Sequence, residues 1–99
     1  MAYHVGFVDP VLEHLAGIEG LTDEDRAAIV AAVTEELSRD ADRFLALYPL
    51  THEALCFRYN YPYVTATTGY DFDFVVSAHN SAMGVVTVMY VEYTTQPVP

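Results

Sequence analysis

The chain has no lysine and no tryptophan, and it has a single cysteine. Its basic side chains are all arginines, four in number, against 14 aspartates and glutamates, which gives a formal net charge of −10. Proteins hold nucleic-acid backbones with Lys and Arg side chains that displace counterions. We therefore expect no direct binding to nucleic acid. One cysteine, Cys56, cannot form an internal disulfide and is interpreted as inert strand packing.

Long apolar runs are also lacking. No run approaches the roughly 18 residues of a transmembrane helix, so no membrane association is expected. Residues 1–10 show neither the basic start nor the apolar stretch of a secretory signal, which favours a cytoplasmic protein. With 99 residues, of which 53% are hydrophobic, the chain is expected to form one domain over residues 1–99.

Helical patterns dominate the chain as far as Pro49. Asp9 is expected to cap a first short helix, because a proline follows it at the first helical position. A second helix should begin at Thr22, with Asp25 as the other half of a capping box, and should end at Pro49. A break in this second helix is expected within residues 38–40.

Strand patterns occupy the remaining segments, namely 2–8, 54–59, 70–78 and 85–93. The last of these is apolar on both faces, which is typical of a central strand. It should pair with the strand before it and with the first strand. Pro62 indicates an edge or a bend, because proline cannot donate to a sheet ladder.

The order of expected elements is therefore β-α-α-β-β-β. Two helices from one contiguous segment would pack as a hairpin on one face of a small, mostly antiparallel sheet. This is an α+β fold.

Two acids alternate with aromatic residues in "YDFDFVV", so that Asp71 and Asp73 face one way and Phe72 and Phe74 the other. Paired carboxylates can perform acid–base chemistry or bind a cation. They can also keep a sheet face hydrated and prevent edge-to-edge association. We favour the second role, because no further acid or histidine visibly converges on them.

Tyrosines cluster in the same half of the chain. Tyr59, Tyr61 and Tyr63 share one strand face, and Tyr70 follows on the next strand. Tyrosine is enriched at protein interfaces. An exposed aromatic row that contacts a partner is one interpretation, and ordinary sheet packing is the other.

Metal and cofactor signals are weak. His52 and Cys56 would share one face of a helix, but two ligands do not make a zinc site, and no second pair has ligand spacing. No metal site and no cofactor are predicted.

Three stretches, "FVDPVLEHLAGI", "GYDFDFVVSA" and "GVVTVMYVEY", together with the element order, resemble the RelE/ParE superfamily of toxins from toxin–antitoxin systems. The second stretch resembles the family's Gly-Tyr-Arg-x-x-Tyr strand, with Gly69 and Tyr70 matching and Phe74 in place of the later aromatic. The resemblance implies a strand, a helical hairpin and a curled sheet. It also implies an antitoxin-like peptide as partner.

Ribosome-dependent members are implied to bind and cut messenger RNA with basic side chains and a terminal Tyr or His. Here Asp71 stands in the place of the arginine and would repel phosphate. Only Arg58, Tyr90 and Tyr93 are left as weak catalytic candidates. We therefore expect a non-enzymatic module that binds a protein partner or forms a homodimer, using Tyr59, Tyr61, Tyr63, Tyr70, Asp71 and Asp73.

Two alternatives remain open at this point. One is an active growth-inhibiting toxin, either a ribosome-dependent RNase or a gyrase poison, with atypical residues. The other is an acidic nucleic-acid mimic that inhibits a basic protein.

Overall fold

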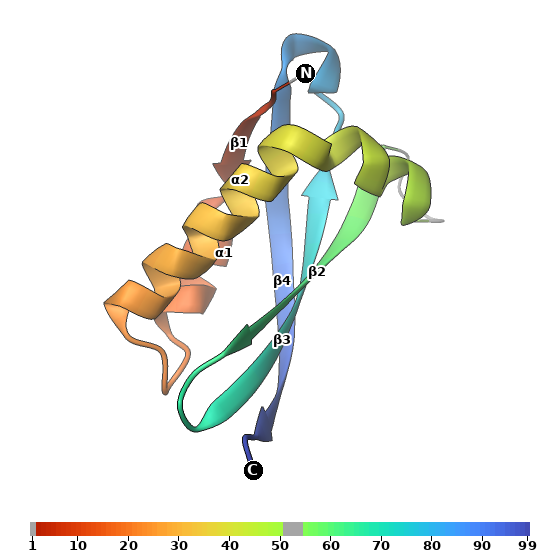
Figure 1. Ribbon diagram of the computed structural model, residues 1–99. Coiled ribbons are helices and arrows are strands. Elements are labelled where there is room, and N and C mark those ends of the chain that lie inside the picture. Colours follow the sequence, from red (N-terminus) through yellow and green to blue (C-terminus); the bar gives the residue numbers. More distant parts are fainter. Residues whose placement is uncertain (1, 51–54) are drawn as a thin grey trace.

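The computed structural model describes residues 2–50 and 55–99. Two helices lie against one face of a four-stranded sheet (Figure 1), so the predicted α+β class and the β-α-α-β-β-β order are confirmed. In chain order the elements are β1 (His4–Phe7), α1 (Asp9–Ala16), α2 (Asp23–Leu47), β2 (Cys56–Val64), β3 (Thr68–Ser77), the 3-10 turn η1 (Ser81–Met83) and β4 (Val85–Pro97).

The strands stand in the order β1-β4-β3-β2. As predicted, β4 is central and has neighbours on both sides. It pairs antiparallel with β3 and parallel with β1. The pairing with β1 covers only Val85 to Val88, whereas the pairing with β3 continues to Pro97. In Figure 1 the β2–β3 hairpin and the end of β4 accordingly reach past the helices.

The helix ends follow their local chemistry, with one correction. Val8, in extended conformation, is the N-cap of α1, and Asp9 is the first helical residue, so the prediction that Asp9 caps this helix is wrong. The capping box of α2 is confirmed: Asp25 N–H donates to Thr22 Oγ1 at 3.1 Å, and Thr22 N–H donates to the Asp25 carboxylate at 2.9 Å. Asp40, at φ −119°, interrupts α2 within the predicted break.

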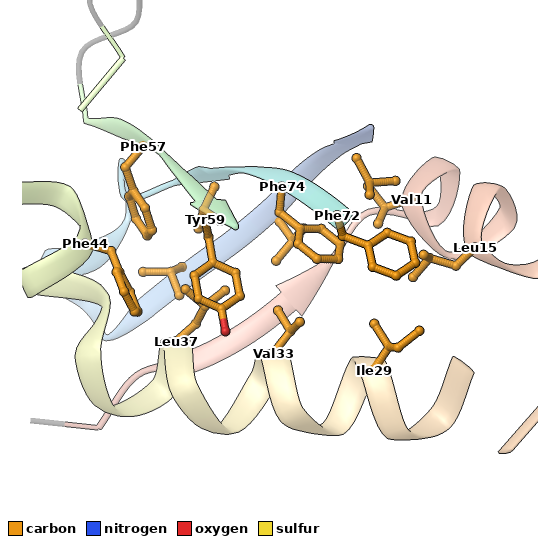
Figure 2. Packing of buried hydrophobic residues seen from close by; sticks show 14 of the residues in the cluster. Val11, Leu15, Ile29, Val33, Leu37, Phe44, Phe57, Tyr59, Phe72 and Phe74 are labelled. Carbon is orange, nitrogen blue, oxygen red and sulfur yellow. The ribbon is translucent and has the colours of Figure 1, made fainter. Parts of the chain in front are cut away.

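The hydrophobic core lies between the helices and the sheet. In Figure 2 side chains of α2, such as Ile29 and Val33, point toward Phe72 and Phe74 of β3. All four are completely buried, and each contributes about 1.5–3 kcal/mol by leaving water. The predicted inward direction of the β3 phenylalanines is confirmed.

The second strand is longer than expected and passes straight through Pro62 to Val64. β2 forms an edge of the sheet. The N–H of Arg58 donates away from β3, to the carbonyl of Tyr48 at 3.1 Å. The direction of the N–H and C=O groups alternates along a strand, so the peptide nitrogen of Pro62 also faces away from β3. Because it faces away, the missing N–H of proline costs no hydrogen bond of the β2–β3 ladder.

Candidate protein-binding surface

The helices leave one side of the sheet uncovered, here called the open face. Strand alternation and register place on it the side chains that do not point at the helices. They include His4 and Gly6 of β1, Arg58, Asn60, Pro62 and Val64 of β2, Gly69, Asp71, Asp73 and Val75 of β3, and Tyr90, Glu92, Thr94 and Gln96 of β4.

Three carboxylates gather on the open face, from two neighbouring strands. Asp73 lies directly opposite Glu92 of β4 and opposite Asn60 of β2. The Asn60 side-chain amide donates to Asp71 at 2.6 Å and to Asp73 at 3.3 Å. The Tyr90 hydroxyl donates to Glu92 at 3.3 Å. All these donors are neutral, and no ion pair with the three acids is found among the described residues.

Ion pairs form elsewhere in the molecule. Those of the described residues involve Arg26 and Arg39, both on α2, and none reaches an open-face acid. Like charges directly opposite each other on neighbouring strands destabilise a sheet. The Asp73–Glu92 pair is therefore a local cost, and no ion pair between described residues reduces it.

The tyrosines lie on the other side of the sheet, and this corrects the predicted exposed row. Tyr59, Tyr61 and Tyr63 do share one face, but that face is the one covered by α2. Tyr59 is 2% exposed and Tyr70 is 5% exposed, while Tyr61 and Tyr63 pack partly buried against the core. Ordinary sheet packing, the second interpretation, describes them.

The tyrosine hydroxyls connect the sheet and the N-terminal strand region to the helix layer. Tyr63 donates to Asp25 of α2 at 2.7 Å, and Tyr3 donates to Asp42 of α2 at 2.6 Å. Tyr70 donates to the carbonyl of Glu19, in the connection between the helices, at 3.1 Å. Two acids of α2, Asp25 and Asp42, thus serve as acceptors for buried or half-buried phenols.

Contacts of this kind raise the pKa of the tyrosines Tyr3 and Tyr59 and lower the pKa of Asp25. The hydrogen bond to Asp42 raises the pKa of Tyr3. Desolvation, followed by a hydrogen bond to Glu36, raises the pKa of Tyr59 well above its ordinary value. The backbone N–H of Thr22, followed by the Tyr63 hydroxyl, lowers the pKa of Asp25. The phenols are thereby held neutral, and Asp25 is held ionised.

The weak catalytic candidates do not converge. Arg58 and Tyr90 lie on either side of Val75 in one row of the open face. Tyr93 points to the helix side, where its ring meets His14 edge-on with centroids 5.9 Å apart. The structure therefore places the three residues on two opposite faces.

A hollow of about 380 Å³ wraps the outer edge of β2 beside Arg58, with Tyr48 and Phe44 among its walls. Its charged lining residues are Glu36, Asp73 and Arg58. Among the described residues that line it there is no serine, cysteine or histidine that could form a nucleophile–base pair.

No group of three His, Cys, Asp or Glu side chains within residues 2–50 and 55–99 could hold a metal ion. His52 lies outside these described residues. Among the described helices, none combines the length and apolar character needed to cross a membrane.

Sequence reasoning identified Asp71 and Asp73 on the open face but missed Glu92 and Asn60. Glu92 belongs to an apolar strand, and its position opposite Asp73 depends on the sheet register. That register shifts between Val75 and Val76, so no spacing in the sequence reveals the pairing.

Comparison of the chain with protein-family models, with curated proteins and with solved structures found no match.

Proposed function

We propose that the protein is a non-enzymatic protein-interaction module that binds a basic partner through the open face of its sheet. The observation that carries this proposal is the group formed by Asp71, Asp73 and Glu92 on two adjacent strands. It includes a directly opposed like-charge pair, and none of its acids forms an ion pair with a described residue. A surface arrangement that costs stability is understandable where a partner supplies the missing positive charge.

Charge complementarity suits recognition in particular. A field of one sign steers an oppositely charged protein and speeds its association, and it suppresses binding of like-charged proteins. The overall formal charge of −10 strengthens this field. Phosphate-bearing partners are disfavoured by the same argument, because the open face offers them only Arg58 as a strong cation.

Apolar side chains beside the acids add contact area. Tyr90, on the open face, is 52% exposed, and Met89 at the register shift is 47% exposed. Tyrosine and methionine are enriched in the desolvated centres of protein interfaces. The combination of acidic groups and exposed apolar residues supports a protein partner rather than a small ion.

The resemblance to RelE/ParE toxins suggests one biological setting for this module. A toxin-like fold with Asp71 in place of a cation would act through protein contact, and its partner would be an antitoxin-like segment. A nucleic-acid-binding protein is the basic partner expected if the acids instead mimic a phosphate backbone.

The test removes the opposed charges without altering shape. The double variant Asp73→Asn, Glu92→Gln is compared with the control double variant Glu13→Gln, Glu19→Gln. The control removes the same charge from exposed acids for which no ion pair is found. Each protein is immobilised, and the proteins that it captures are quantified by mass spectrometry and ranked by isoelectric point.

The open-face variant should lose basic proteins that the control retains. It should also be more stable than the control by about 0.2–1 kcal/mol in urea unfolding, because like-charge repulsion across the strands is relieved. Equal capture by the two variants would contradict an open-face binding site. Lower stability of the open-face variant would contradict the argument from like-charge cost.

A further inference from the structure

The outer edge of β4 is paired with β1 over the first part of the strand and has no partner strand over the rest. The N–H of Val8 donates to the carbonyl of Val88 at 3.1 Å, so the peptide groups of Val88 face away from β3. The register pairs Val76 with Val88 but Val75 with Tyr90, which makes Met89 an extra residue. Beyond this bulge, the outward-facing peptide groups are therefore those of Val91, Tyr93 and Thr95.

No strand covers these three peptide groups, but Val91 is 2% exposed, so the accessible edge begins at Tyr93. β1 ends opposite Val88. No hydrogen bond between described residues uses the outward N–H or C=O groups of Tyr93 or Thr95. Residues 92–97 are exposed in an unbroken run. An uncovered row of donors and acceptors is a template for another strand.

The opposite edge of the sheet is protected where this one is not. On β2, the first outward-facing groups are already hydrogen-bonded: the N–H of Arg58 donates to the carbonyl of Tyr48, and the N–H of Leu50 donates to the carbonyl of Cys56. Pro62 then removes an outward N–H. Such devices block unwanted strand addition. Along β4 the first proline is Pro97, after the row of free groups has ended.

Two hollows run along the free edge of β4. One, of about 340 Å³, is lined by Tyr90 and Glu92 from the open face and by Val91 and Tyr93 from the helix side. The other, of about 100 Å³, continues it toward Met89. His14 of α1 lines both hollows. Residues from both faces of the strand line them, so the hollows wrap around the edge, where an added strand would lie.

We propose that the β4 edge from Tyr93 to Thr95 binds an extended, basic segment of a partner protein as an additional strand of the sheet. This rests on the proposed function, which supplies a basic partner. Backbone hydrogen bonds would fix the segment, and alternate side chains would fall beside Glu92 on the open face. A second copy of this chain fits poorly, because it would bring together two molecules of formal charge −10.

The probe is a short peptide of alternating lysine and valine, and its control is the same peptide methylated on every backbone nitrogen. Both peptides carry equal charge, but only the first can donate to a strand edge. Amide hydrogen exchange of the protein is followed by NMR. The unmethylated peptide should slow exchange of the Tyr93 and Thr95 amides by at least severalfold. The Glu92 and Thr94 amides, which already face β3, serve as internal references and should change little.

Two proline variants supply matched controls. Thr95→Pro removes one outward donor of β4 and should weaken peptide binding about fivefold to tenfold, as expected for a lost hydrogen bond. Val64→Pro removes an outward donor from the β2 edge and should leave binding unchanged. Neither substitution interrupts the ladder with β3.

Several outcomes would overturn strand addition at β4. Equal binding of the methylated peptide would show that charge alone holds it. Slowed exchange at Asn60 and Val64 would place the peptide on the other edge. Failure to bind, or a dimer whose Tyr93 and Thr95 amides are already protected, would also overturn it. In each case the proposed function is judged separately, by the Asp73 and Glu92 variants.

Discussion

The two faces of the sheet use their polar groups in opposite ways. On the covered face, tyrosine hydroxyls donate outward from the sheet, to Asp25 and to the carbonyl of Glu19 in the helix layer. On the open face, polar contacts stay within the sheet, as between Asn60 and Asp71, and no ion pair with its acids is found among the described residues. Acids of helix α2, such as Asp25, thus contribute to the fold, whereas acids on the open face remain available to a partner.

A single strand displays this division. β3 alternates Phe72 and Phe74 with Asp71 and Asp73, and the phenylalanines are completely buried. The residues that hold the domain together and those that we assign to binding are therefore adjacent in sequence. Substitutions on one face should affect stability, and those on the other should affect recognition.

The largest predicted effect separates the faces by stability. Phe74→Ala should reduce the free energy of unfolding by about 3–5 kcal/mol, because it leaves a cavity in the core. Val75→Ala, the adjacent position on the open face, should cost about 1 kcal/mol. Urea unfolding followed by circular dichroism measures both. Similar losses for the two variants would mean that the faces do not differ in burial as described.

Much of the fold could be predicted from alternation and capping. The apolar character of residues 85–93 on both faces indicated a central strand, and the structure confirms it. Alternation also showed that Tyr59 and Tyr63 share a face. It could not show that helix α2 covers this face, because a pattern of period two does not reveal which side the helices occupy. That is why the exposed tyrosine row was wrong.

The candidate site was only half predictable for a similar reason. Asp71 and Asp73 follow the strand period, so their direction could be predicted. The position of Glu92 opposite Asp73 depends on the extra residue Met89, and a bulge leaves no mark in a strand that is apolar on both faces. The free edge of β4 depends on the same bulge, as well as on the short length of β1.

Alanine substitutions at two glycines should have effects on stability of intermediate size, and they test the contact of the Tyr70 hydroxyl with the helix layer. Gly20 and Gly84 both have positive φ, 88° and 78°. A Cβ on Gly20 would lie 2.6 Å from the Tyr70 hydroxyl, whereas one on Gly84 would meet nothing within 4 Å. Gly84→Ala should therefore cost only the backbone strain, about 1–2 kcal/mol. Gly20→Ala should cost more, because it also displaces the hydroxyl from Glu19.

Thermal unfolding of the two alanine variants measures this difference. The double variant Gly20→Ala, Tyr70→Phe lacks the obstructing hydroxyl. Compared with Tyr70→Phe alone, it should therefore lose about as much stability as Gly84→Ala loses relative to the wild type. If Gly20→Ala and Gly84→Ala are equally destabilised, the hydroxyl contact of Tyr70 does not contribute to holding the loop between the helices.

The smallest expected effect concerns pH and the bond between Tyr63 and Asp25. The pKa of Asp25 is lowered in the folded state, so its contribution to stability is present above about pH 4 and is lost as pH falls through the lowered pKa. The pKa of Tyr63 is raised, chiefly by its hydrogen bond to Asp25. Its contribution is therefore present below about pH 10 and is lost as pH rises through the raised value.

Tyr63→Phe should reduce both losses, so that its stability changes less steeply than that of the wild type below about pH 4 and above about pH 10. Urea midpoints measured across these ranges test this. Tyr61→Phe is the matched control on the same strand, because no hydrogen bond of its hydroxyl is found among the described residues. Below about pH 4 its stability should fall as steeply as that of the wild type, because its bond between Tyr63 and Asp25 is intact. If the stability of Tyr63→Phe falls as steeply too, the phenol–carboxylate bond does not link this hairpin to α2 in solution.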